Sequence, residues 1–228
     1  MTQIKNVVLV HGDFVDGSGW RQVYDLLTSD GYRVSVVQHP NLSLAGDVLA
    51  TLRVLRSQDG PCVLVGHSYG GVVISEAGTD DNVAVLAYVA AFAPDSGESA
   101  RDLMSAGPAT PPPRDGFLLV DRDRFHASFA ADLPPAEARF MADSQVPWRV
   151  DARGGQVNRP AWRTKPSWYL VATDDRMIPP SAQRAMAGRA GSTVREIAAS
   201  HSVYVSQPHA TADFIRQAAA MRAEESRK

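Results

Sequence analysis

The sequence contains one cysteine, no strong excess of either charge and no long apolar segment. The single cysteine, Cys62, excludes a disulfide within the chain, and its place in an apolar run predicts a small buried side chain. A formal net charge of −2 offers no basic surface of the kind that neutralises nucleic-acid phosphates. The apolar runs are too short for a membrane helix, and the first residues lack the apolar core of a signal peptide. We therefore predict a cytoplasmic protein that binds neither nucleic acid nor a membrane.

The chain is rich enough in apolar residues to bury a sizeable core. Its 228 residues are 44% hydrophobic, which predicts a single domain. Short apolar runs alternate with segments of helical length, and this alternation is typical of a parallel β-sheet with helices on both faces. About six buried strands are expected, at residues 7–10, 34–37, 62–65, 83–91, 168–172 and 193–198, with helices near residues 18–30, 44–57, 69–79, 180–190 and 206–223.

The alternation of strands and helices stops between residues 94 and 165. Prolines in the stretch ATPPPRD interrupt the chain, and short helical stretches such as DRFHASFAADL replace strands. A solvated linker has few large apolar side chains, whereas this segment contains Phe125, Phe129, Phe140, Met141 and Trp148. We therefore predict that residues 94–165 form a small helical cap, inserted within one domain that spans residues 1–228.

Residues 66–70 read Gly-His-Ser-Tyr-Gly and stand between an apolar run and a predicted helix. A strand that turns sharply into a helix needs small residues beside its apex, so the pattern presents the Ser68 hydroxyl at the end of the strand. A structural glycine-rich loop would have the same pattern. A serine acts as a nucleophile only beside a base that is itself oriented by a third group. Candidates follow later strands, with Asp174 and Asp175 after the fifth and His201 after the sixth, where a parallel sheet brings its loops to one edge.

Four segments make the chain resemble the α/β-hydrolase superfamily, in particular small bacterial esterase-like proteins related to plant methylesterases, hydroxynitrile lyases and pyrethroid-hydrolysing carboxylesterases. They are VLVHGDFVDGSGW (8–20), VGHSYGG (65–71), VATDDRMIPP (171–180) and SHSVYVSQP (200–208). The resemblance implies Ser68 as the nucleophile and His201 as the general base. It implies Asp175 as the orienting acid, because the family's acid precedes an R-x-I-P pattern; Asp174 is the alternative.

The resemblance also implies an oxyanion hole formed by two backbone N–H groups. We assign these donors to Asp13 and Tyr69, with Phe14 as an alternative donor. The Asp13 side chain is expected to point away, because a carboxylate that faces the oxyanion would oppose catalysis. The pocket beneath the cap is expected to be modest and mostly apolar. Its candidate lining residues, some of which could be ordinary core, are Phe14, Phe125, Phe129, Met141, Trp148 and Met177.

No cofactor or metal ion is predicted for this chain. The sequence has no cluster with metal-ligand spacing and no dinucleotide-binding fingerprint after a strand. The remaining histidines are interpreted as structural. His67 is expected to pack at the turn and His11 to stabilise its loop, while His39 is expected at the surface or in the cap.

The predicted function is that of a serine hydrolase that cleaves a small, largely apolar carboxylic ester or lactone through an acyl-enzyme. One alternative is a lyase or carbon–carbon hydrolase that uses the same triad. Related hydroxynitrile lyases have a lysine beside the histidine where this chain has Ser202, which disfavours that reaction. Another alternative is a ligand-binding receptor built on the same fold. The sequence specifies neither the substrate nor the oligomeric state.

Overall fold

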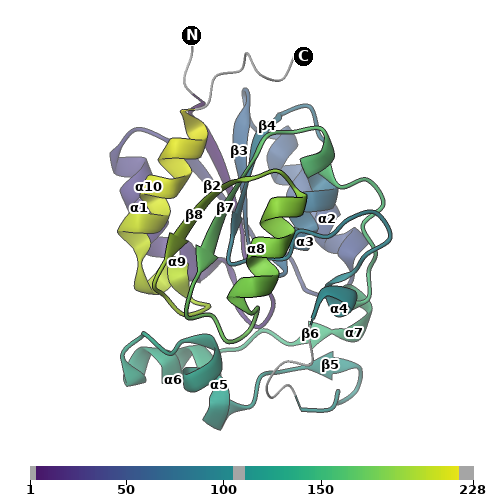
Figure 1. Cartoon of the computed structure of the whole chain (residues 1–228), viewed down its shortest axis with the longest axis vertical. Helices are drawn as coiled ribbons and strands as arrows, with labels where there is room; N and C mark the ends of the chain where they lie inside the picture. The colour runs from purple at the N-terminus through teal and green to yellow at the C-terminus, as the bar shows by residue number, and fades with distance from the viewer. Residues whose placement is uncertain (1–3, 105–110, 221–228) are drawn as a thin grey trace.

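The computed structural model describes residues 4–104 and 111–220. Within these residues, six strands form one parallel sheet in the order β2-β1-β3-β4-β7-β8 (Figure 1). This arrangement confirms the predicted fold class. The strands are β1 (Asn6–Val10), β2 (Arg33–Val37), β3 (Cys62–His67), β4 (Val83–Val89), β7 (Ser167–Ala172) and β8 (Thr193–Ile197).

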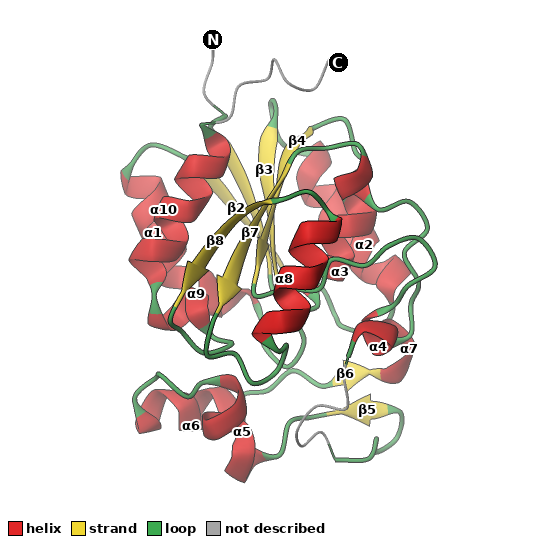
Figure 2. Cartoon of the chain, viewed as in Figure 1, coloured by secondary structure: helices red, strands yellow, loops and turns green. Residues whose placement is uncertain are grey.

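Helices cover both faces of the sheet (Figure 2). On one face, α1 (Arg21–Ser29) packs against α10 (Pro208–Ala219). The other face is covered by α2 (Leu44–Arg56), α3 (Gly70–Ala77) and α8 (Pro180–Arg189). The last predicted helix extended to residue 223, and residues 221–223 of it lie outside the described residues.

Alternating side chains of each strand divide the apolar residues into two cores. Val7 and Leu9 of β1 face the core under α1 and α10, whereas Val8 and Val10 face the core under α2 and α3. Cys62 at the start of β3 is fully buried, as predicted. Both cores extend along the central strands, so the sheet forms a rigid support for the loops at its ends.

Much of the segment between β4 and β7 lies beyond the carboxyl ends of the strands, and its last part returns to the start of β7 (Figure 1). It contains two helices, α5 and α6, where the sequence predicted helical stretches. It also contains a two-stranded antiparallel sheet that was not predicted, because two-residue strands are too short to show an alternating pattern. Its elements are α4 (Ala100–Leu103), β5 (Phe117–Leu118), α5 (Arg122–Phe129), α6 (Pro135–Asp143), β6 (Trp148–Arg149), α7 (Val150–Arg153) and the 3₁₀ helix η2 (Ala161–Arg163).

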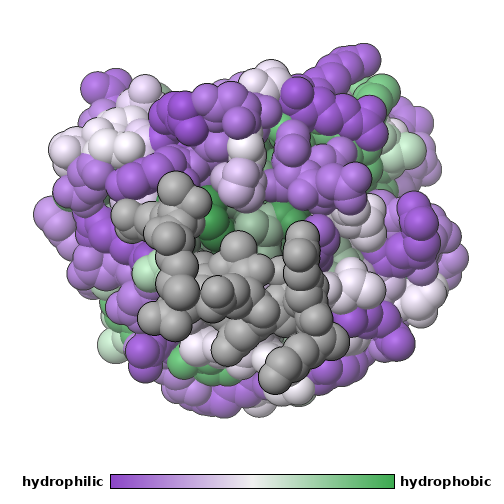
Figure 3. All heavy atoms as spheres, turned by 90° about the horizontal axis from the view of Figure 1, so that it is seen from above, coloured by the Kyte–Doolittle hydropathy of each residue, from purple (hydrophilic) through white to green (hydrophobic). Residues whose placement is uncertain are grey.

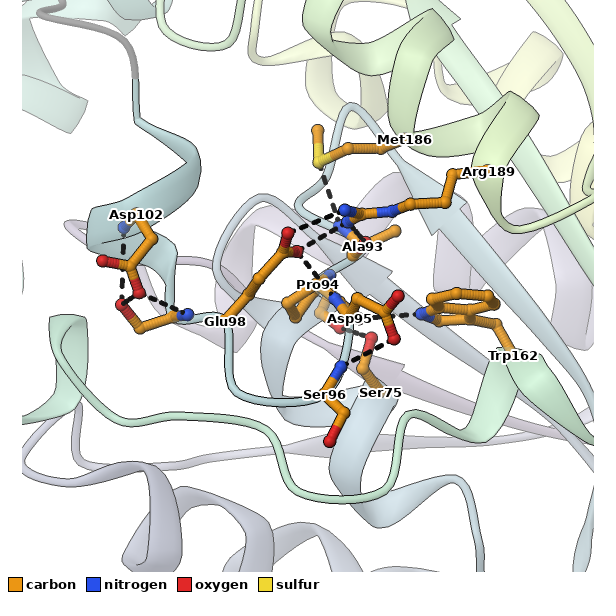
Figure 4. Close-up of polar contacts among 12 residues, drawn as sticks. Ser75, Ala93, Pro94, Asp95, Ser96, Glu98, Asp102, Trp162, Met186 and Arg189 are labelled. Atoms are coloured by element: carbon orange, nitrogen blue, oxygen red, sulfur yellow. Dashed lines mark hydrogen bonds and ion pairs between the residues drawn. The ribbon is translucent and has the colours of Figure 1, made fainter.

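Polar contacts tie the start of this segment to α8 (Figure 4). Both carboxylate oxygens of Glu98 accept hydrogen bonds from Arg189 at 2.7 Å. Arg189 also donates to the Ala93 carbonyl at 2.9 Å, and Trp162 Nε1 donates to the Pro94 carbonyl at 2.8 Å. These contacts fix the direction in which the chain leaves the end of β4.

The face at the opposite end of the molecule from α5 and α6 is mostly hydrophilic over its described atoms (Figure 3). Among the residues that the structure describes, no helix is long and apolar enough to cross a membrane. The large apolar side chains of these residues are mostly buried.

The position of β1 between β2 and β3 creates a crevice at the carboxyl ends of β1 and β3. The chain leaves these two neighbouring strands toward opposite sides of the sheet, and such points are where open α/β sheets bind ligands. The loop after β1 carries Asp13, and the turn after β3 carries Ser68. The loops after β7 and β8 carry Asp175 and His201.

Candidate active site

Ser68 occupies a strained turn between β3 and α3. Its φ of 52° lies in the left-handed region that residues other than glycine rarely adopt. The turn is held by the Ser68 carbonyl, which accepts hydrogen bonds from the N–H groups of Gly71 at 2.9 Å and Phe92 at 3.1 Å. A Cβ at Gly66 would lie 2.6 Å from the Gly70 carbonyl oxygen, so only glycine allows strand and helix to approach this closely. The strained apex holds the Ser68 hydroxyl at the end of the strand.

Ser68, His201 and Asp175 form one line of contacts although they are far apart in the sequence. Ser68 Oγ lies 2.9 Å from His201 Nε2, and His201 Nδ1 lies 2.8 Å from Asp175 Oδ2. Because a carboxylate can only accept, the proton of a neutral His201 resides on Nδ1, which leaves Nε2 free to accept the Ser68 proton. The exposed fractions of the three residues, in the order Ser68, His201 and Asp175, are 2%, 1% and 4%. Bulk water therefore has little access to these contacts.

Asp175 is held by four hydrogen bonds. Its Oδ1 accepts from the backbone N–H groups of Met177 at 2.7 Å and Ile178 at 3.0 Å. Its Oδ2 accepts from Gln183 Nε2 at 2.8 Å in addition to His201. Asp174, the alternative acid, is exposed. The structure thus brings Asp175 rather than Asp174 to the histidine.

Gln183 is a site residue that the sequence did not reveal. It is fully buried on α8, and its amide group also donates to the Ile178 carbonyl and accepts from the Ala172 N–H group. A glutamine in the first turns of a helix resembles a solvated surface residue in the sequence. Only the contact between α8 and the end of β7 shows that Gln183 fixes the position of the acid.

Neighbouring rings hold the His201 side chain and its loop. His67 Nε2 lies 2.9 Å from the His201 carbonyl oxygen, and the Phe129 ring meets the His201 ring edge-on with centroids 4.7 Å apart. Burial, followed by the proximity of His201, lowers the pKa of His67 well below its ordinary value. His67 therefore stays neutral, and the packing role predicted for it agrees with its position.

The prediction for the Asp13 side chain is wrong. Its carboxyl group points toward Ser68, with Oδ1 3.0 Å from Ser68 Oγ, and Asp13 is only 4% exposed. The physical reason is that the polar partners of this buried carboxyl are the Ser68 hydroxyl and the backbone N–H groups of Asp13 itself and Tyr69. A rotation toward the apolar interior would leave the carboxyl without hydrogen bonds.

A second buried polar network lies behind Tyr69 and was not predicted. Asp47 Oδ2 accepts a hydrogen bond from the Tyr69 hydroxyl at 2.9 Å, and Asp47 Oδ1 accepts one from the Asn41 N–H group at 3.1 Å. His39 lies 3.6 Å from the same carboxylate and stacks on His11 with ring centroids 3.8 Å apart. His39 is therefore buried, and its predicted place at the surface or in the cap is wrong. Asp47 resembles an ordinary acid in the first turn of a helix, so its sequence position carried no signal.

This network does not form a metal site. Among the described residues, no group of three or more histidine, cysteine, aspartate or glutamate side chains is arranged to hold a metal ion. The contact between Asp47 and the Tyr69 hydroxyl instead anchors the residue that follows Ser68. It thereby holds the backbone N–H group of Tyr69 in place beside Ser68.

The six predicted pocket residues differ in their contacts and in their burial. Phe129 contacts the His201 ring, and Phe125 stacks on Phe129 with centroids 4.8 Å apart. The Trp148 ring centroid lies 5.1 Å from that of Tyr69, and Trp148 meets Phe14 edge-on at 5.7 Å. Met141 and Met177 are partly exposed, whereas the other four side chains are fully buried and pack as core: Phe14, Phe125, Phe129 and Trp148.

A cavity of about 290 Å³ opens between the loop after β1 and α6. Phe14 and Met141 line it together with Tyr204 and the exposed Phe140, while Ser68 is not among its lining residues. Two of the predicted pocket residues therefore border this cavity. Whether any of the six contacts a substrate stays a prediction.

Known proteins resemble this chain over most of its length. A family model described as the alpha/beta hydrolase family matches residues 7–214. A pyrethroid hydrolase of Sphingobium wenxiniae is 28% identical over an alignment of 253 positions, gaps included, which covers 93% of this chain and 86% of that protein. Methylesterase 8 of Arabidopsis thaliana is 26% identical over an alignment of 208 positions, gaps included, which covers 80% of this chain and 76% of that protein. The crystal structure of a pyrethroid hydrolase from Sphingobium faniae shares the fold with a TM-score of 0.83 at 24% identity, covering 97% of this chain and 99% of that one.

Proposed function

The chain belongs to the alpha/beta hydrolase family, and we propose that it is a serine hydrolase that cleaves a small, largely apolar carboxylic ester or lactone. Its relatives are named as hydrolases and esterases, which confirms the predicted resemblance and the prediction of an esterase-type enzyme. The observation that carries the finer proposal is the buried line of contacts from Ser68 through His201 to Asp175. In each of these two contacts, the donor and acceptor atoms lie within hydrogen-bond distance of each other.

In the proposed reaction, Ser68 Oγ attacks the carbonyl carbon of the ester while its proton passes to His201 Nε2. The π electrons of the carbonyl move onto its oxygen, which accepts hydrogen bonds from the N–H groups of Asp13 and Tyr69. His201 then gives its proton to the leaving alcohol, and an acyl group stays on Ser68. Water, deprotonated by His201, releases the acid and restores the serine. Asp175 keeps the imidazole in the required tautomer throughout.

The surroundings of the triad support an apolar substrate. Phe129 packs against the His201 ring, and Trp148 packs against Tyr69, so aromatic rings surround the groups beside Ser68. Apolar walls strengthen each hydrogen bond within the site because they lower the local dielectric constant. Relatives named as a methylesterase and a carbendazim-hydrolysing esterase support an ester as the substrate class.

Turnover of p-nitrophenyl acetate, butyrate and octanoate tests this proposal. Ser68→Ala removes the nucleophile, and we expect kcat/KM to fall by at least about 10³-fold. Ser96→Ala, which changes an exposed serine, is the matched control and should stay within about twofold. Both variants should melt near the temperature of the unmodified protein. Undiminished turnover by a folded Ser68→Ala variant would contradict the proposal, and so would a folded wild-type protein that hydrolyses none of the three esters.

A further inference from the structure

The carboxyl group of Asp13 is a buried acid in contact with the nucleophile, and ester hydrolysis as described above uses only its backbone N–H group. Asp13 Oδ1 lies 3.0 Å from Ser68 Oγ, and the same oxygen of Ser68 lies 2.9 Å from His201 Nε2. The N–H groups of Asp13 and Tyr69, which an oxyanion would need, are close enough to this carboxyl to lower its pKa. The carboxyl therefore lies beside the place where the carbonyl oxygen of a substrate attacked by Ser68 would bind.

The hydrogen atoms at this site restrict the state of Asp13. Ser68 carries one hydroxyl hydrogen but stands between two acceptors, His201 Nε2 and Asp13 Oδ1. When Ser68 donates to His201, as attack requires, lone pairs of Ser68 and Asp13 face each other unless Asp13 is protonated and donates to Ser68. When Ser68 donates to Asp13, a neutral His201 faces a lone pair unless it gains a second proton. Both satisfied arrangements contain the same number of protons, so one proton is shared along Asp13, Ser68 and His201.

The environment favours a proton on Asp13. Burial is the largest influence on its pKa and raises it, while the charge of protonated His201, the Ser68 hydroxyl and the two N–H groups oppose this effect without cancelling it. The other ionisable groups that interact with Asp13 are the hydroxyls of Tyr69 and Tyr204, and burial raises the pKa of each. Both tyrosines therefore stay neutral, so neither adds a negative charge beside Asp13.

We propose that Asp13 is a further catalytic acid of this site, whose protonated carboxyl donates to the carbonyl oxygen of the substrate while Ser68 attacks the carbonyl carbon. This step rests on the proposed function. The carboxyl turns aside about its Cα–Cβ bond to admit the oxygen. As the π electron pair moves onto that oxygen, the Ser68 hydrogen passes to His201 and the Asp13 hydrogen is shared with the oxyanion. When the carbonyl forms again, that hydrogen stays with Asp13, and His201 protonates the leaving oxygen, so no further reagent is needed.

The ionised form of Asp13 has the opposite effect. A carboxylate accepts the hydrogen bond of Ser68, and its charge opposes an oxyanion that forms beside it. Hydrolysis therefore requires a neutral His201 and a protonated Asp13 together. This requirement gives a bell-shaped dependence on pH, whose two limbs belong to the pair rather than to either residue alone.

Two substitutions at Asp13 separate its roles. Asp13→Asn has the same shape, stays uncharged at every pH and still offers an N–H donor, whereas Asp13→Ala has no donor. The control is Asp25→Asn, which changes an exposed carboxyl on α1 to an amide. Two rates are measured between about pH 5 and pH 9: kcat/KM for p-nitrophenyl acetate, and the labelling of Ser68 by a fluorophosphonate. Thermal melting of each variant shows that it is folded.

We expect the wild type and Asp25→Asn to lose activity at both ends of the pH range. Asp13→Asn should stay within about tenfold of the wild-type maximum and lose the alkaline fall, and Asp13→Ala should be about 10²-fold slower at the wild-type optimum. An Asp13→Ala variant as fast as the wild type would overturn the proposal, because the carboxyl would then only obstruct the pocket. A loss of activity at alkaline pH that persists in Asp13→Asn would also overturn the proposal. This result tests the proposal even if Asp13→Ala does not fold. If no ester is turned over, the proposed function fails, while the labelling rates still test Asp13.

Discussion

Replacement of Asp175 by asparagine changes one oxygen to an NH₂ group and leaves the shape of the side chain unchanged. In the wild type, Oδ1 accepts from the N–H groups of Met177 and Ile178, and Oδ2 accepts from Gln183 and His201. The remaining oxygen of the asparagine must face Met177 and Ile178, because an NH₂ group there would oppose two backbone donors. The new NH₂ group then faces His201 Nδ1 and the NH₂ group of Gln183.

An NH₂ group facing His201 Nδ1 reverses the imidazole tautomer. Nδ1 must become the acceptor, so the proton moves to Nε2, and Nε2 no longer accepts the proton of Ser68. Serine proteases with this replacement lose about 10⁴-fold in kcat, which corresponds to about 5.5 kcal/mol of transition-state stabilisation. The new NH₂ group also opposes that of Gln183, and the two facing donors should lower the free energy of unfolding by about 1–3 kcal/mol.

The assay is kcat for p-nitrophenyl acetate at neutral pH, with urea unfolding measured on the same samples. Asp174→Asn changes the exposed neighbour on the same loop and should reduce kcat by no more than about twofold. The reasoning is refuted if Asp175→Asn retains more than about a tenth of the wild-type kcat. A large loss in Asp174→Asn would move the role of the acid to Asp174.

Two further predictions concern stability. A Cβ at Gly71 would lie 2.1 Å from the Phe92 carbonyl oxygen, so Gly71→Ala should lower the free energy of unfolding in urea by about 3 kcal/mol or more. Gly188 on α8 has open space around it, so Gly188→Ala should raise the free energy of unfolding by about 0.5–1 kcal/mol. Equal effects of the two substitutions would contradict the packing described. Burial, with the nearby His39, lowers the pKa of His11 to about 3 in the folded protein. As the pH falls, His11 is therefore protonated in the unfolded chain before it is protonated in the folded one. The stability that is present above about pH 6.5 is lost as the pH falls toward 3. At pH 5 the loss should be about 2 kcal/mol, and an equal loss in folded His11→Gln would assign the acid sensitivity to other groups.

The sheet could be predicted from the sequence because its strands are short and its four central strands are buried. The expectation that all six strands are buried is wrong, because β2 and β8 lie at the edges of the sheet and are largely exposed or half-buried. Apolar runs such as residues 62–65 alternate with helical segments, and this alternation is compatible with few architectures. The closeness of Ser68, His201 and Asp175 was expected from the same reasoning, since loops after parallel strands lie at one edge. Their catalytic roles were implied by the resemblance and stay predictions. Ser68 and His201 lie where the order of strands and loops predicted them, and only the choice between Asp174 and Asp175 needed the R-x-I-P pattern.

Side-chain directions and short-range packing could not be predicted. The orientation of Asp13 depends on rotation about one bond and on partners supplied by the turn after β3. The burial of His39 depends on Asp47, an acid on a helix that the sequence gives no reason to pair with it. Gln183 reaches Asp175 only because α8 packs beside β7. In each case the contact that fixes the side chain joins two different strands, helices or loops. The pattern of residues within a single strand or helix does not predict such a contact.

Covalent labelling by a fluorophosphonate tests most directly whether Ser68 is an activated nucleophile. Intact-protein mass spectrometry should show one adduct per chain, and peptide mapping should locate it on Ser68. The adduct should be absent from Ser68→Ala and should form more slowly in Asp175→Asn. A folded wild-type protein that stays unlabelled at neutral pH, or that carries its adduct on another residue, would contradict the assignment of Ser68 as the nucleophile.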